Sequence, residues 1–405
     1  MSTKAAFGLS ALPETPRAVR RVRMAPKLAY CNLFHDKLSL AVTLVGIVFS
    51  VLLMAVQCGI YLGTSDMIAA VIDRTDADIW VMAGGIKTVD DPSPLEGNER
   101  FAVLSTPGVA EVEDLIITFA SWRKPRGGSQ TVLVVGSDMK GSHLRPWNLK
   151  AGAGSIEALA SPMAVAVDET YFKDLGIAAL GDHAEINKTR VTVSAVTQGI
   201  RTFTTMPFVF TNLVRAKAIA QAGPDQSAKP TYLLAKVKPG ADIETVRKAI
   251  AARLPTEQVL TKAEFRYRSI DYWMNQTGAG LALIAGAFLG LIVGIVVVAQ
   301  TLYSSTKDHL NEFATLRAMG ASANYIHQVI LIQALLSAVV GYAVGMALSL
   351  FAVLTIQTYV PELAISMTPG LAAALLAVTV SMCALAALSA IFKVTRIDPA
   401  GVFSR

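Results

Sequence analysis

Charged residues are missing from four long stretches of this sequence. The uncharged runs cover residues 38–62, 278–303, 325–358 and 369–392, and none of them contains Lys, Arg, Asp or Glu. A helix needs about 20 apolar residues to cross the hydrocarbon core of a membrane. A core helix of a water-soluble protein, by contrast, keeps one polar face. The four runs therefore predict four transmembrane helices.

Cysteine is also scarce. The three cysteines, Cys31, Cys58 and Cys383, lie in or beside the apolar runs, and the polar block 63–277 contains none. That block must therefore fold without disulfides. Its length of about 215 residues is sufficient for an ordinary hydrophobic core.

Basic residues outnumber acidic ones mainly at the two ends of the chain. The leader 1–37 has seven basic and two acidic residues, the tail 393–405 has three and one, and the block 63–277 has 24 of each. Short positively charged segments stay in the cytoplasm, so both ends are expected there and the large block outside. Basic ends also favour contact with anionic membrane lipids. No basic patch with interleaved aromatic residues is present, which argues against nucleic-acid binding.

Recognisable nucleotide-binding, catalytic and metal-binding motifs are absent as well. The sequence has no Gly-x-x-x-x-Gly-Lys-Ser/Thr loop and no nucleophile elbow, and its five histidines show no ligand spacing. We therefore expect a non-catalytic chain without a metal site or a cofactor of its own. If ATP and Mg²⁺ drive it, another chain binds them. The uncharged runs favour force transmission or lipid-like cargo over a polar pathway, with a passive membrane anchor as the alternative.

The polar block alternates strand-like and helix-like segments, which predicts a split α+β domain. The expected strands are residues 78–82, 131–135, 164–167, 190–196 and 232–237. The expected helices are residues 98–105 and 243–254, the second with Asp242 as its N-cap. Residues 64–74 and 269–277 are expected to extend the first and second spans as stalk helices. The predicted fold is thus four transmembrane helices with a large extracytoplasmic α+β domain between the first two.

Residues 304–324, after the second run, predict a short amphipathic cytoplasmic helix. Leu310 and Phe313 share one helical face, Gly320 fits a helix C-cap, and Ser322 can begin the next helix. Helices that lie in the lipid headgroups usually carry basic residues on their polar face. This segment is charge-balanced, which favours a protein partner.

Glycine recurs at every fourth position in two of the apolar runs, a spacing that permits close helix approach. The positions are Gly286, Gly290 and Gly294 in the second run, and Gly341 and Gly345 in the third. Contacts within one subunit or between two subunits both fit this pattern, and we favour contacts within one subunit.

The segment Glu312–Ser322 (EFATLRAMGAS) resembles the stretch that follows the second span in permeases of the FtsX/MacB/LolC superfamily. The nearest pattern is that of the DevC-type exporter permeases. Further similarities are found in residues 292–303 and 398–403, and at four other places. These are Tyr272-Trp273, Gly136, Asp168-Glu169 and Lys307-Asp-His-Leu.

The resemblance implies an ABC-type exporter permease of the bacterial inner membrane that works as a homodimer. Residues 304–324 would then be a coupling segment seated on a separate ABC ATPase. The coupling residues would be Leu310, Glu312, Phe313, Leu316, Arg317, Met319 and Gly320. The domain 63–277 would resemble the periplasmic core of MacB and bind a membrane-fusion adaptor, with an outer-membrane channel beyond it. A regulator of a cell-wall enzyme and a lipid or lipoprotein extractor are the alternatives.

The charge distribution gives a direct test of topology. In a variant without native cysteines, Ser129→Cys and Ser404→Cys should react with a membrane-impermeant maleimide from opposite sides, with position 129 outside. Labelling of both positions from one side would contradict the four-span arrangement.

Overall fold

The computed structural model describes residues 25–125, 127–139, 141, 143–223, 228–308, 315, 319 and 322–395. The chain forms two compact units. The first comprises the described parts of residues 1–58, 285–353 and 367–405, and the second comprises those of residues 59–284 and 354–366. The leader 1–24 and the tail from residue 396 lie outside the described residues.

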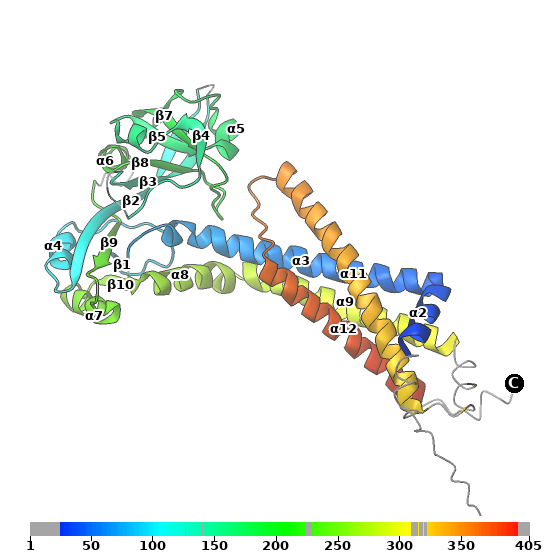
Figure 1. Ribbon diagram of the computed structural model, residues 1–405. Coiled ribbons are helices and arrows are strands. Elements are labelled where there is room, and N and C mark those ends of the chain that lie inside the picture. Colours follow the sequence, from blue (N-terminus) through cyan, green and yellow to red (C-terminus); the bar gives the residue numbers. More distant parts are fainter. Residues whose placement is uncertain are drawn as a thin grey trace, which may run out of the picture. The chain divides into compact units, whose positions relative to one another are not determined.

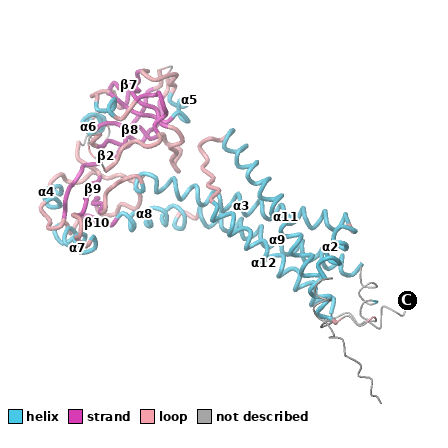
Figure 2. The backbone as a smooth tube through the Cα atoms, in the orientation of Figure 1, coloured by secondary structure: helices cyan, strands magenta, loops and turns pink. Residues whose placement is uncertain are grey.

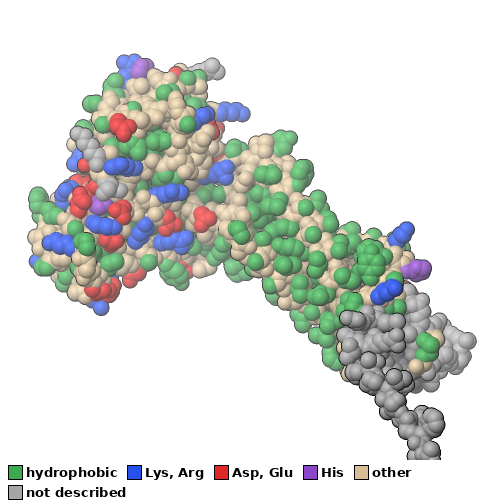
Figure 3. Space-filling view, in the orientation of Figure 1, with side chains coloured by type: hydrophobic (Ala, Val, Ile, Leu, Met, Phe, Trp, Pro, Cys, Tyr) green, Lys and Arg blue, Asp and Glu red, His purple; other side chains and the backbone are tan. Residues whose placement is uncertain are grey.

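The first unit is helical (Figures 1 and 2), and it includes most of each apolar run. The helices that contribute to it are α2 (Ala25–His35), α3 (Lys37–Asp73), α9 (Ala279–Asp308), α11 (Ala323–Tyr359) and α12 (Pro369–Thr395). Among the described residues, four helices are long and apolar enough to cross a membrane: Lys37–Asp73, Ala279–Asp308, Asn324–Tyr359 and Pro369–Phe392. Hydrophobic side chains cover this unit in the space-filling view (Figure 3). The protein is therefore a multi-pass membrane protein.

The second unit is a mixed α/β fold around one ten-stranded sheet (Figure 2). Its strands run in the order β10-β1-β9-β2-β3-β8-β5-β7-β4, and β6 pairs with β2 and β7. Two pairs, β3 with β8 and β5 with β7, are parallel. The strands are β1 (Ile79–Ala83), β2 (Val109–Arg123), β3 (Ser129–Ser137), β4 (Leu149–Gly154), β5 (Ala164–Asp168), β6 (His183–Ile186), β7 (Thr189–Thr197), β8 (Phe208–Asn212), β9 (Tyr232–Val237) and β10 (Glu257–Thr261).

Short helices complete the second unit. They are α4 (Glu99–Leu104), η1 (Glu157–Ala160), η2 (Glu169–Tyr171), α5 (Phe172–Leu175), α6 (Leu213–Gln221), α7 (Ile243–Arg253), α8 (Lys262–Asp271) and η3 (Tyr272–Gln276). Each of the five expected strands and both expected helices has a counterpart within two residues. Asp242 is the N-cap of α7, and its carboxylate accepts a hydrogen bond from Thr245 N at 2.8 Å.

The longest strand, β2, was not expected from the sequence. Its first half pairs with β9 and its second half with β3, so it joins the two parts of the sheet. Both faces are buried at Leu115–Ile117, whereas acidic residues occupy several earlier positions. A strand whose surroundings change along its length shows no uniform alternation of apolar and polar residues, which is the signal that sequence reading depends on.

The end of α3 belongs to the core of the α/β unit. Val71 and Ile72 are buried in a cluster with residues from β1, β2, β3 and α8. In that cluster the ring of Trp80 lies edge-on to Tyr232, with centroids 5.4 Å apart, and 5.1 Å from Phe265. Helix α3 is continuous from Lys37 to Asp73, in keeping with the stalk extension expected at residues 64–74.

The second expected stalk, residues 269–277, is not a simple continuation of α9. Helix α8 ends at Asp271, a π-helical turn follows over Tyr272–Gln276, and Thr277 N donates to Tyr272 O at 3.1 Å. Gly278 then has a φ of +80°, a conformation that glycine adopts without steric cost. The expectation of an unbroken helix into the second span was therefore wrong at this residue.

Asp168 fixes the turn at the end of β5. This buried carboxylate accepts hydrogen bonds from Thr170 N at 3.1 Å, Thr197 Oγ1 at 3.0 Å and Ile200 N at 2.8 Å. It thereby connects β5 to the end of β7 and to the loop that follows.

Asp168→Asn should lower the free energy of unfolding of the second unit by about 2 kcal/mol. The NH₂ group of asparagine would replace one of the accepting oxygens, and it would then point at a hydrogen-bond donor. All four tryptophans lie in this unit, so their fluorescence during unfolding reports on it. The exposed residue Asp91 provides the control, since Asp91→Asn should leave the transition unchanged. Equal transitions for both variants would contradict the role of the Asp168 network.

Candidate functional site

Most of the expected coupling segment lies outside the described residues. This applies to Leu310, Glu312, Phe313, Leu316, Arg317 and Gly320. Met319 is described: its side chain is exposed, and its N–H donates to Thr315 O at 3.0 Å, which is a helical i to i−4 bond. Contact of this segment with an ATPase stays a prediction.

The glycines of the second apolar run lie against α3. A Cβ added to Gly286 would stand 2.8 Å from Gln57 Nε2, and one added to Gly290 would stand 3.2 Å from Leu53 Cδ2. A Cβ on Gly294 would meet Ser50, whose hydroxyl donates to Gly290 O. A side chain at these positions would therefore force α9 away from α3.

The glycines of the third run also lie against α3. A Cβ on Gly341 would stand 2.6 Å from Ile47 Cγ2, and one on Gly345 would stand 2.9 Å from Val51 Cβ. The structure thus places all five glycines against one helix of the same chain. Helix α3 is the common partner of α9 and α11.

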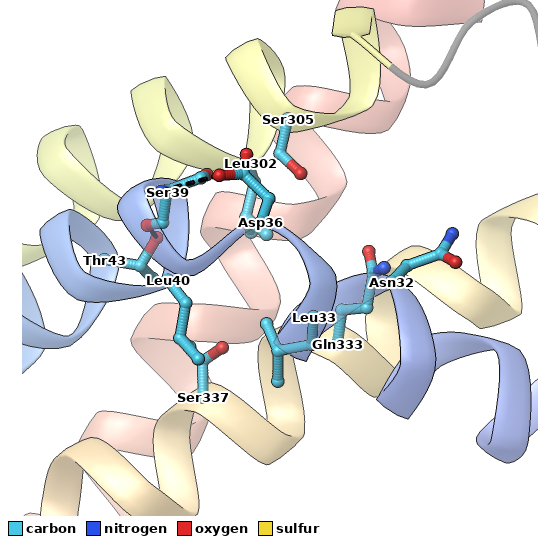
Figure 4. A pocket seen from close by; sticks show the side chains of 10 residues that line it. All are labelled: Asn32, Leu33, Asp36, Ser39, Leu40, Thr43, Leu302, Ser305, Gln333 and Ser337. Carbon is cyan, nitrogen blue, oxygen red and sulfur yellow. Dashed lines mark hydrogen bonds between the residues drawn. The ribbon is translucent and has the colours of Figure 1, made fainter.

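A small polar pocket opens near the start of α3 (Figure 4). It is lined by Asn32, Leu33, Asp36, Ser39, Leu40, Thr43, Leu302, Ser305, Gln333 and Ser337. Asp36 accepts a hydrogen bond from Ser39 N at 3.1 Å and so caps α3 after the short helix α2. The pocket's volume of about 10 Å³ is at the lower limit for one water molecule. It is too small to hold a lipid-like molecule.

The segment between α11 and α12 packs on the later part of α3, within the second unit. Ser366 N donates to Gly59 O at 3.0 Å, and Ser366 Oγ donates to Asp66 Oδ2 at 3.2 Å. An added Cβ on Gly63 would lie against Ala364 O. Gly63 therefore permits the close backbone contact. We call residues 360–368 the α11–α12 link.

The same link reaches the loop after β7. Arg201 Nη1 donates to Leu363 O at 3.3 Å, and the neighbouring residue Ile200 is held by Asp168. These contacts could not be predicted from the sequence, because the link contains only one charged residue, Glu362. The α11–α12 link is thus bonded to both the later part of α3 and the loop after β7.

A further grouping comprises Glu111 and Glu113 of β2 and His143 from the connection between β3 and β4. One ligand atom from each residue lies within 4.8 Å of the others. Burial raises the pKa of Glu113, and the neighbouring His143 acts in the opposite direction. Sequence spacing predicted no metal site, because His143 is 30 positions from the nearer carboxylate and only the β2–β3 hairpin brings them together.

Ionic contacts lie beside this grouping. Lys236 Nζ stands 2.8 Å from Asp76 Oδ1 and 3.4 Å from Asp78 Oδ1. The hydrogen bond from Lys236 holds the pKa of Asp76 below its usual range. These contacts join β9 to the connection that leads from α3 into β1.

Four apolar helices and a mixed α/β unit define the class: a multi-pass membrane protein with one large α/β domain. Comparison with protein-family models agrees with this class. The MacB-like periplasmic core domain matches residues 40–253, and the FtsX-like permease C-terminal region matches residues 284–399. The chain belongs to the MacB/FtsX family of permeases. The superfamily resemblance seen in the sequence is confirmed, whereas the DevC subtype stays a prediction.

Solved structures give weaker similarities. The periplasmic region of MacB from Actinobacillus actinomycetemcomitans has a TM-score of 0.34 and 10% identity, over 49% of this chain and 94% of that one. The extracellular domain of the noncanonic ABC-type transporter YknZ from Gram-positive bacteria has a TM-score of 0.33 and 12% identity, over 45% and 98%. The search of curated proteins finds no match.

Gly63→Val should displace the α11–α12 link from α3, because the new side chain would occupy the position of Ala364 O. Amide exchange in peptides covering residues 360–368 should then rise at least tenfold. Gly370→Ala provides the control, since a Cβ there meets only Thr368 Oγ1 at 3.9 Å. Unchanged exchange in Gly63→Val would show that the link is not held by this contact.

Proposed function

We propose that this chain is the permease subunit of an ABC-type exporter and transmits ATP-driven movement from a separate ATPase to its α/β unit. The observation that carries the proposal is helix α3. Its earlier part packs among the apolar helices, and its last turns are buried in the core of the α/β unit at Val71 and Ile72. A continuous helix of 37 residues is about 55 Å long at 1.5 Å per residue.

A continuous helix suits this function because its backbone hydrogen bonds resist changes in length. Movement at one end is therefore accompanied by movement at the other. The segment entering α9 differs, because the π-helical turn and Gly278 interrupt the helix there. Single π-helical turns are frequently found at functional sites. We infer that α3 carries displacement while the segment before α9 bends.

The α11–α12 link adds a second connection. It is bonded to α3 at Gly59 and Asp66 and to the α/β unit at Arg201. A shift of α11 and α12 would thus act on the same part of the molecule as a shift of α3. Both α3 and the α11–α12 link thus contact the same part of the α/β unit. This arrangement favours transmission of movement to that unit over passive anchoring of it.

The cargo is expected to be lipid-like or otherwise hydrophobic. The apolar runs contain no charged residue, and intramembrane charges usually mark the pathways of ions and polar substrates. Cargo would therefore enter from the outer leaflet or from the extracytoplasmic side.

The proposed assembly places the protein in a bacterial inner membrane with both termini in the cytoplasm. Two copies of the chain would bind two ATPase subunits through residues 304–324, and ATP and Mg²⁺ would be held by those subunits. The α/β unit would engage a membrane-fusion adaptor, with an outer-membrane channel beyond it. The sequence supports a separate ATPase, since the chain has no phosphate-binding loop of its own.

Ala70→Pro tests transmission through α3. A proline in a helix interior removes a hydrogen bond, kinks the helix and costs about 3 kcal/mol, whereas Ala70→Ser keeps the N–H group and provides the control. Ala70 lies after the apolar run, one turn before Arg74, whose N–H bonds Ala70 O at 3.2 Å. Membrane insertion and ATP hydrolysis by the bound partner should therefore persist.

The readout is hydrogen exchange in β1, β9 and β10 of the reconstituted complex, with and without a non-hydrolysable ATP analogue. The analogue should change exchange in the wild type and in Ala70→Ser, but not in Ala70→Pro. An equal response in the proline variant would show that α3 does not transmit the movement.

A further inference from the structure

Glu111, Glu113 and His143 meet beside the connection that leads from α3 into the sheet. The two glutamates are alternate residues of β2, so they project from the same face of the strand. His143 O accepts a hydrogen bond from Asp76 N at 2.8 Å, which places the histidine next to the end of α3. The grouping therefore lies beside the C-terminal end of α3, within the second unit.

The imidazole of His143 lacks the partners that buried polar groups normally have. Its side chain is 1% exposed, and neither ring nitrogen has a hydrogen-bond partner among the described residues. Glu113 Oε2 is also buried without a partner there. Leaving such groups unsatisfied is costly, and native structures contain few of them. Three buried polar atoms without a hydrogen-bond partner at one place therefore require an explanation.

The spacing of the atoms suits a shared cation. His143 Nε2 and Glu111 Oε2 are 3.7 Å apart, which is too long for a hydrogen bond. Two ligands that are each about 2.1 Å from a tetrahedral zinc ion stand roughly 3.4 Å apart. Small side-chain rotations would thus bring the ligand atoms to an ion placed between them.

Gly141 leaves room for the buried carboxylate. A Cβ added there would meet Glu113 Oε1 and would stand 2.7 Å from Glu113 Cδ. The backbone of the β3–β4 connection therefore approaches Glu113 more closely than a residue with a side chain would allow.

The charge of the grouping also favours a cation. Glu111 and Glu113 contribute two carboxyl groups, and carboxylate oxygens attract cations. Lys236 is opposite Glu111 in the register of β2 and β9, yet its ammonium group binds Asp76 and Asp78. A dication between the three side chains would balance their charge and give the buried nitrogen and oxygen a partner.

We propose that Glu111, Glu113 and His143 bind one divalent transition-metal ion of the Zn²⁺ class. Imidazole suits Zn²⁺ and similar ions, whereas Mg²⁺ and Ca²⁺ prefer sites built only from oxygen. Three protein ligands leave a fourth position for water. The bound ion would fasten the β3–β4 connection to β2 beside the end of α3, where the structure gives His143 its backbone contact with Asp76.

Metal binding by the purified full-length chain tests the proposal. The three cysteines are changed to serine to remove thiol ligands, and the protein is treated with a chelator, dialysed in detergent and titrated with Zn²⁺ by calorimetry. We expect about one ion per chain. Glu111→Gln and His143→Gln should each weaken binding at least tenfold, whereas His183→Gln should not. His183 is an exposed histidine of the same unit, bonded to Thr192, and provides the matched control.

Glu111→Gln keeps the test decisive if the buried His143 variant fails to fold, because the Glu111 side chain is 58% exposed. Absence of a Zn²⁺ site, or binding that Glu111→Gln leaves unchanged, would overturn the proposal. Equally tight binding of Mg²⁺ or Ca²⁺ would overturn the assignment to the Zn²⁺ class. No ATPase partner is present in this experiment, so its outcome is independent of the proposed transport function.

Discussion

Close packing against α3 is the constraint on which the rest of the membrane unit depends. Gly286, Gly290 and Gly294 of α9 approach one part of its surface, and Gly341 and Gly345 of α11 approach another. Apolar helices gain little from hydrophobic burial inside a membrane, so their association depends on close van der Waals contact between small residues. A displacement of α3 would therefore disturb both neighbouring helices.

The same helix also supplies part of the α/β core through Val71 and Ile72. Three features of that unit lie near the later part of α3. They are the ion pairs of Lys236, the packing of the α11–α12 link on Gly63, and the Glu111–Glu113–His143 grouping. Each involves a different segment that lies against the later part of α3 or against the connection that follows it. The backbone before α9 is interrupted at Gly278, whereas α3 is continuous from Lys37 to Asp73.

The sequence was most informative where one signal dominated. Uncharged runs predicted the four apolar helices, and Asp242 predicted the start of α7. Strand β2 was missed because it crosses from one part of the sheet to the other, so its buried face is not constant. Gly278 was missed because a single glycine beside an apolar run does not reveal its backbone angle.

The metal-ligand grouping and the α11–α12 link were missed for a different reason. Both depend on contacts between residues far apart in sequence: His143 meets β2 only through the β2–β3 hairpin, and Ser366 meets α3 across 300 positions. The coupling residues, from Leu310 to Gly320, were proposed from their resemblance to a family. The family itself is confirmed by the match of its models to most of the chain.

In the proposed function, a separate ATPase drives this chain. The most direct measurement is purification of the chain from its native membrane in mild detergent, with identification of the co-purifying proteins and assay of ATP hydrolysis. We expect an ABC ATPase to co-purify, and its hydrolysis should depend on the chain and be lost with Leu316→Asp. The chain alone should hydrolyse no ATP. Robust hydrolysis by the chain alone, or recovery of a cell-wall hydrolase without any ATPase, would contradict it.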